Sequence, residues 1–163
     1  MKIIVMLVLF QFNPQYIPIW MGREPIQYCI SGEMEPYREQ VVYSFFAWAS
    51  RTGLYARETR DCSAPRTVAY RMQPMDTYSG IGMYPPPLIV EPWAGDVWLD
   101  SKRDWGGGAR PLLVPTLLHE TGHAWGMGHS LRPESVMNPD LRPNRVMLDS
   151  LEKRAIEYLY LGE

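Results

Sequence analysis

The chain has 163 residues, a length that fits one domain with a sizeable hydrophobic core. Its formal net charge is −2 and its arginines are scattered, so the sequence predicts no nucleic-acid surface. A hydrophobic fraction of 46% and an aromatic fraction of 12% are typical of globular proteins. The longest apolar run is much shorter than the ~20 residues that cross a bilayer, so we expect no membrane span. We also expect a monomer.

Residues 1–18 form an N-terminal stretch with two interpretations. A single lysine precedes an apolar run over residues 3–10, which resembles the core of a secretory leader. No small-residue cleavage site follows this run, and a buried leading strand explains it equally well. We therefore treat residues 1–18 as a leader or an N-terminal extension, and residues 19–163 as one folded domain.

The first predicted elements are a strand and a helix. Residues 26–30 alternate between apolar and polar side chains like a strand. Pro36 favours the start of a helix, and Gly53 favours the end of this helix after about Arg51. The helix is expected to pack its apolar stripe into the core. The stripe consists of Val41, Val42, Phe45, Phe46 and Ala49.

Residues 54–58 and 67–72 are short strand candidates separated by turn-forming residues. The order strand, helix, strand, strand predicts a mostly parallel twisted sheet backed by helices. Two more helices follow near the end of the chain. Pro115 is tolerable only in a first turn, which places one helix start near Val114. The last helix starts at Asp149, whose spacing to Glu152 is that of a capping box.

The two cysteines, Cys29 and Cys62, leave two alternatives open. The first lies in the predicted strand 26–30 and the second in the loop after a neighbouring strand. A disulfide between them would stabilise the folded state by about 3 to 4 kcal/mol on the chain-entropy estimate. Two buried free thiols fit the sequence equally well.

The most informative stretch runs from His119 to His129 and contains all three histidines of the chain. His119 and His123 are four residues apart, so on a helix they share one face. Glu120 flanks that face, where a carboxylate touches a metal-bound water rather than the metal. Gly126 permits the chain reversal that returns His129 to the first two rings. Three nitrogen ligands and one open position describe a catalytic zinc site, whereas a structural zinc has four protein ligands.

This stretch resembles the extended zinc motif of the metzincin metallopeptidases. Ser130 follows the third histidine, as in the matrixins, the group of the matrix metalloproteinases. Residues 135–139 resemble the matrixin Met-turn, with Met137 beneath the zinc. The resemblance covers residues 19–163 and implies an α+β metzincin fold. Such a fold has a twisted, mostly parallel five-stranded sheet with an antiparallel edge strand, and three helices.

The resemblance also assigns residues that bind substrate. The segment Gly80, Ile81, Gly82 and Met83 is similar to the matrixin edge strand, along which an extended peptide pairs. Residues 140–143 resemble the wall of the specificity pocket. Leu118, Pro139 and Leu141 are the expected pocket residues. Their apolar character predicts a hydrophobic side chain after the cut bond.

Matrixins usually hold further metal ions in the middle of the domain. Met83 and Trp98 stand about where histidines of a structural zinc are expected, so we predict that this zinc is absent. Arg103 occupies the place of a usual calcium ligand, which makes calcium doubtful. The acidic side chains Asp76, Asp100 and Asp104 are better explained as a solvated loop.

The resemblance thus implies an extracellular or secreted zinc metalloendopeptidase with one catalytic Zn²⁺ and a protein or peptide substrate. A zinc ion ligated by His119, His123 and His129 is expected to activate a water molecule. Glu120 is the expected general base that takes a proton from this water. Two alternatives remain. One is a non-catalytic zinc-binding pseudoprotease or interaction module, and the other is a zinc hydrolase that acts on something other than protein.

Overall fold

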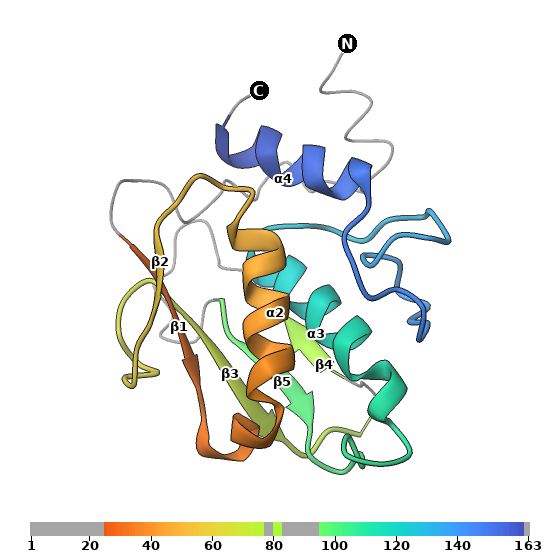
Figure 1. Cartoon of the computed structure of the whole chain (residues 1–163). Helices are drawn as coiled ribbons and strands as arrows, with labels where there is room; N and C mark the ends of the chain where they lie inside the picture. Colours follow the sequence, from red (N-terminus) through yellow and green to blue (C-terminus); the bar gives the residue numbers. More distant parts are fainter. Residues whose placement is uncertain (1–24, 77–79, 83–94, 162–163) are drawn as a thin grey trace.

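A computed structural model describes residues 25–76, 80–82 and 95–161 of the chain (Figure 1). Its centre is a five-stranded sheet with the strand order β2-β1-β3-β5-β4. The strands are β1 (Ile26–Ile30), β2 (Ala56–Glu58), β3 (Thr67–Gln73), β4 (Gly80–Gly82) and β5 (Val97–Asp100). β1, β2, β3 and β5 pair in parallel, and β4 pairs antiparallel to β5. The predicted fold class is confirmed.

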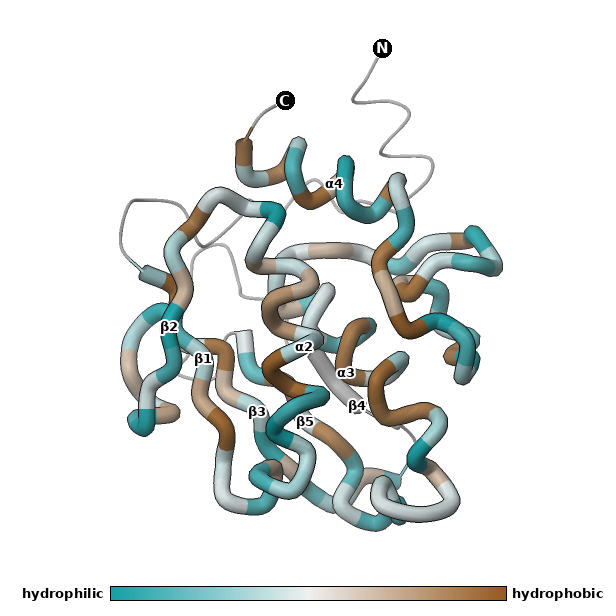
Figure 2. Tube along the Cα trace, viewed as in Figure 1, coloured by the Kyte–Doolittle hydropathy of each residue, from teal (hydrophilic) through white to brown (hydrophobic). Residues whose placement is uncertain are grey.

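The sheet is buried at its centre, where β3 lies between β1 and β5. Gln27 pairs with Thr67 in the β1–β3 register, and Tyr70 pairs with Val97 in the β3–β5 register. Four of the five β1 residues and the first four of β3 are buried. Such near-continuous burial is expected where helices cover a parallel sheet. Hydrophobic segments accordingly gather where α2 and α3 meet the strands (Figure 2).

The first helix begins differently from the prediction. Gly32–Tyr37 forms a 3-10 helix (η1), and the α-helix α2 spans Arg38–Ala49. Pro36 therefore lies inside the 3-10 turn instead of opening the α-helix. Gly53 has a φ of +68°, which lets the chain turn away after the helix, as predicted.

The buried face of α2 is also shifted from the predicted stripe. Val41, Phe45 and Ala49 are buried as expected, but Phe46 is 40% exposed. Trp48 is fully buried instead, because α2 packs on α3 as well as on the sheet. Its indole Nε1 donates a hydrogen bond of 2.9 Å to the carbonyl oxygen of Leu118. This tertiary contact explains why the stripe cannot be read from hydrophobicity alone.

Helix α3 spans Arg110–Ala124 and begins one turn earlier than predicted. Pro115 therefore lies inside the helix, where its missing N–H leaves the carbonyl of Pro111 without its helical partner. Leu113, in the added turn, is only 4% exposed and belongs to the core. We attribute the early start to this burial, which outweighs one lost hydrogen bond.

Helix α4 spans Ser150–Leu161 and has the predicted capping box. Asp149 Oδ1 accepts hydrogen bonds of 2.8 Å from the backbone N–H groups of Leu151 and Glu152. Glu152 Oε2 in turn accepts the backbone N–H of Asp149 at 2.8 Å. Near its other end, α4 contacts α3 through Tyr160, whose hydroxyl donates to the carbonyl oxygen of Trp125 at 3.0 Å.

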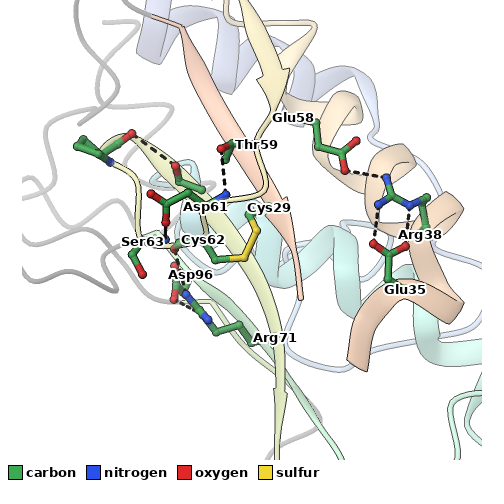
Figure 3. Close-up of a disulfide and its surroundings, with 12 residues drawn as sticks. Cys29, Glu35, Arg38, Glu58, Thr59, Asp61, Cys62, Ser63, Arg71 and Asp96 are labelled. Atoms are coloured by element: carbon green, nitrogen blue, oxygen red, sulfur yellow. Dashed lines mark hydrogen bonds and ion pairs between the residues drawn. A yellow bond between two sulfur atoms is a disulfide. The ribbon is translucent and has the colours of Figure 1, made fainter. Parts of the chain in front are cut away.

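Cys29 of β1 and Cys62, in the loop between β2 and β3, form a disulfide (Figure 3). The structure thereby decides between the two alternatives that the sequence left open. Arg71 of β3 braces the same region, because its guanidinium donates to the carbonyl oxygen of Cys62 and to the carboxylate of Asp96, each at 3.0 Å. No helix of the described residues is long and apolar enough to cross a membrane.

Candidate metal centre

The three histidines meet at the C-terminal end of α3. His119 and His123 stand one turn apart on α3, and His129 follows in the next loop. The three Nε2 atoms lie 3.2 Å from one another in each pairwise combination. His119 and His123 are 4% and 5% exposed, whereas His129 is exposed. The sequence prediction that these rings converge is therefore met by the geometry.

Gly126 causes the convergence. Its φ of +90° lies in the left-handed region that favours glycine, and it ends the helix directly after the second histidine. The backbone N–H of Met127 then bonds to the carbonyl oxygen of Gly122 at 2.9 Å. This reversal carries His129 back towards His119 and His123.

Hydrogen bonds at the far side of two rings determine which nitrogen faces the centre. His119 Nδ1 lies 2.8 Å from the carbonyl oxygen of Val136, and His123 Nδ1 lies 2.8 Å from that of Met127. A carbonyl oxygen only accepts, so both Nδ1 atoms carry the proton. In the neutral rings the Nε2 lone pairs therefore point into the centre.

Such lone pairs cannot satisfy one another, and a cation is the natural partner. Tetrahedral zinc binds imidazole nitrogens at about 2.0–2.1 Å, which places the nitrogens about 3.3 Å apart. The observed spacing of 3.2 Å between Nε2 atoms fits this geometry. Within the described ranges, these three side chains are the one cluster of potential metal ligands.

The rings are also in the protonation state that metal binding requires. Burial is the main cause that lowers the pKa of His119 to about 4; His129 and Arg145 act in the same direction, and the hydrogen bond to Val136 opposes them. Burial lowers the pKa of His123 to about 3 and also lowers that of His129. All three imidazoles are thus neutral at pH 7 and available as ligands.

Glu120 follows His119 on α3 and is 6% exposed. A carboxylate at this position of the helix lies beside the face that carries His119 and His123. Its predicted role as a base is taken up as a proposal below.

A buried turn lies beneath the histidines. Met137 is fully buried, and its backbone N–H donates to Ser135 Oγ at 3.0 Å. The turn packs against Gly122 in the last turn of α3. A Cβ atom at Gly122 would lie 2.8 Å from a ring carbon of Trp48 and still closer to the sulfur of Met137. This explains the glycine inside the helix, because any side chain would displace the turn under the histidines.

The predicted substrate residues lie in different environments. Gly80, Ile81 and Gly82 form β4, the edge strand, which packs against α3, the helix of His119 and His123. Met83 lies outside the described residues. The side chain of Leu118 is fully buried in the core, whereas Leu141 is half-buried and Pro139 is exposed.

The acidic side chains Asp76, Asp100 and Asp104 are held by donors of the chain itself. Asp100 Oδ1 accepts two backbone N–H groups at 3.0 Å, one of them from Lys102. The ammonium of Lys102 pairs with Asp76 at 2.5 Å, and Asp104 accepts two glycine N–H groups. The doubt about calcium stays a prediction. The predicted absence of a structural zinc stays a prediction, because Met83 is not described.

One contact of this site was not predicted. Glu152 Oε1 accepts the hydroxyl of Ser135 and, at 3.3 Å, the backbone N–H of Met137. The capping role of this glutamate was visible in the sequence, because cap partners are close neighbours. Its contact with the Met-turn joins residues that only the tertiary structure brings together, and no local pattern signals it.

A mostly parallel sheet with an antiparallel edge, a helix bearing two histidines and a buried methionine turn below them define the metzincin class of metallopeptidases. Within this class, a model of the family described as Matrixin matches residues 20–161. The chain belongs to the matrixin family. This membership supports a metallopeptidase function.

Three relatives show how far the similarity extends. Matrix metalloproteinase-25 of Homo sapiens is 25% identical over 144 residues, which cover 77% of this chain and 26% of the relative. Its counterpart from Mus musculus is 29% identical over 114 residues, which cover 63% of this chain and 18% of the relative. Matrix metalloproteinase-B of Caenorhabditis elegans is 31% identical over 87 residues, which cover 47% of this chain and 17% of the relative. The chain thus spans about a quarter or less of the relatives' length.

Proposed function

We propose that residues 19–163 are the catalytic domain of a zinc-dependent metalloendopeptidase. The observation that carries this proposal is the triangle of Nε2 atoms, 3.2 Å on each side. His119, His123 and His129 would hold one Zn²⁺. A bound zinc supplies Lewis acidity and makes water a nucleophile near neutral pH.

The remaining steps belong to side chains and backbone of the chain. Glu120 takes the proton from the attacking water and later delivers it to the leaving amine. β4, at the edge of the sheet, pairs with an extended peptide, and its contact with α3 brings that peptide alongside the ligands. Pro139 and Leu141 contact the side chain after the cut bond. We propose that the enzyme acts as a monomer on protein or peptide substrates.

The disulfide supports a secreted or extracellular location, because such bonds persist in oxidising compartments. The alternative is a non-catalytic zinc-binding relative used as an interaction module. Both alternatives predict zinc binding, so metal content does not separate them.

The deciding experiment compares wild type with Glu120→Ala in a casein or peptide cleavage assay. We expect both proteins to bind one zinc and only the wild type to cleave, with a loss of at least a hundredfold in the variant. Equal behaviour of the two zinc-loaded proteins would contradict the peptidase proposal and favour the interaction module.

A further inference from the structure

Arg71 lies on the face of the sheet that points away from the histidines. Its neighbour in β3, Tyr70, points towards α3, because the Tyr70 hydroxyl lies 3.0 Å from the hydroxyl of Thr121. Successive side chains of a strand point to opposite faces, so Arg71 points away from α3. α3 is the helix of His119 and His123. Any effect of Arg71 on the candidate site must therefore pass through the sheet.

The guanidinium of Arg71 joins two segments on that face of the sheet. Its Nη2 donates to the carbonyl oxygen of Cys62, and its Nε donates to Oδ2 of Asp96, each at 3.0 Å (Figure 3). Its central carbon lies 5.6 Å from the centroid of the Trp98 ring, a cation–π contact with β5. Cys62 is itself fixed to β1 by the disulfide with Cys29. Arg71 therefore ties the beginning of β5 to a loop that is covalently anchored on β1.

The carboxylate of Asp96 depends on this arginine. Asp96 is 2% exposed and comes directly before β5, after Gly95, a turn residue with a φ of +94°. A buried carboxylate is costly unless a cation and hydrogen bonds compensate it. Burial raises the pKa of Asp96, and the hydrogen bond and the charge of Arg71 oppose this effect. The entry into β5 is therefore held where Asp96 meets Arg71.

The edge strand β4 takes its alignment from β5. Trp98 lies opposite Arg71 in the β3–β5 register and opposite Ile81 in the β5–β4 register. Two of the three β4 residues, Gly80 and Gly82, have no side chain that could pack the strand in place. Its position depends on the ladder with β5 and on the contact with α3. A shift of β5 would therefore move the strand along which we propose that the substrate pairs.

We propose that Arg71 is a positioning residue for the substrate. It holds β5, and through β5 the edge strand β4, in the alignment that pairs with an extended peptide. This inference rests on the proposed peptidase function. It predicts that Arg71 determines how tightly the peptide binds, while zinc binding and the chemical step depend on residues of the other face.

The first test compares the kinetics of zinc-loaded wild type and Arg71→Met on one peptide. We expect KM to rise about tenfold and kcat to change by less than about twofold, with one zinc bound in both proteins. A protein that is merely destabilised would instead lose kcat at unchanged KM, because only its folded fraction works. Arg71→Lys keeps a cation beside Asp96 and should recover part of the lost affinity.

Two further variants separate the proposed role from general damage. Arg57→Met is the matched control, because Arg57 is an exposed arginine on β2, at the opposite edge of the sheet, and its KM should stay that of wild type. The double variant Arg71→Met, Asp96→Asn leaves no unpaired buried charge, so it should fold even if Arg71→Met does not. It lacks the same tie and should show the same rise in KM.

A second measurement needs no substrate. Amide hydrogen exchange over residues 80–82 and 97–100 should be about tenfold faster in the Arg71 variants than in wild type, and unchanged in Arg57→Met. An unchanged KM, or unchanged exchange in β4 and β5, would overturn the proposal and leave the peptidase function intact. If wild type cuts no peptide, the peptidase function fails, and the exchange data alone decide whether Arg71 holds β4.

Discussion

Glu152 and Ser135 are hydrogen-bonded across 17 positions of sequence, and this bond connects the cap of α4 to the turn beneath the three histidines. One oxygen of the Glu152 carboxylate completes the capping box, and the other accepts from Ser135 and from the backbone of Met137. The side chain is fully buried. The position of the last helix and that of the Met-turn therefore depend on the same carboxylate.

Replacing Glu152 by Ala should lower the free energy of unfolding by about 3 kcal/mol, because buried donors lose their acceptor. Urea unfolding of the zinc-free protein measures this. Glu157→Ala is the matched control on the same helix, since Glu157 only forms a surface pair with Arg51 at 3.3 Å. The control should lose less than about 1 kcal/mol. Equal losses in both variants would argue against the shared role of Glu152.

Gly122→Ala should destabilise the protein although alanine favours helices. The gain of about 1 kcal/mol in helix propensity is outweighed by overpacking against Met137 and Trp48, which costs about 1–3 kcal/mol or more. Thermal unfolding measures the difference. Gly32→Ala is the control, because a Cβ there meets nothing within 4 Å. A Gly122→Ala protein as stable as wild type would contradict the close packing described here.

The chain should bind one zinc ion, measured as metal content after dialysis against zinc-free buffer. His129→Ala should weaken zinc binding severely, because two imidazoles do not complete a zinc site. Removing zinc from the wild type with a chelator should lower its Tm, since the metal binds the folded state. A content of two zinc ions per chain would show that the middle region holds a second site, against our prediction.

Breaking the Cys29–Cys62 disulfide should cost about 3 to 4 kcal/mol, on the chain-entropy estimate for its 33-residue separation. The double variant Cys29→Ala, Cys62→Ala and the reduced wild type should show similar losses in denaturant unfolding. If reduction leaves the unfolding midpoint unchanged, the bond does not stabilise this domain.

The lowered pKa of Asp100 predicts that the free energy of unfolding depends on pH in the acid range. Hydrogen bonds from backbone N–H groups, with that of Lys102 the strongest cause, hold the pKa of Asp100 below its ordinary value. The carboxylate therefore stabilises the fold above the ordinary pKa of about 4, and this contribution is lost as pH falls through the lower folded pKa. The stability difference between wild type and Asp100→Ala should accordingly shrink below about pH 4 in urea titrations. A difference that grows on acidification would contradict this sign.

Much of the fold and of the metal centre could be predicted because the signals are local. The strand at residues 26–30, the turn at Gly53 and the cap at Asp149 each depend on neighbouring residues. The start of α3 and the buried face of α2 were predicted incorrectly. Leu113 and Trp48 take their positions from packing between elements, and hydrophobic periodicity does not report that packing.

By itself, the sequence predicted that the three histidines converge. Helix geometry places His119 and His123 on one face, and a glycine reverses the chain so that His129 joins them. Tertiary structure alone decided the disulfide and the second role of Glu152. The physical reason is distance along the chain. Backbone geometry fixes contacts within a few residues, whereas contacts between distant residues exist only after the sheet and helices have packed.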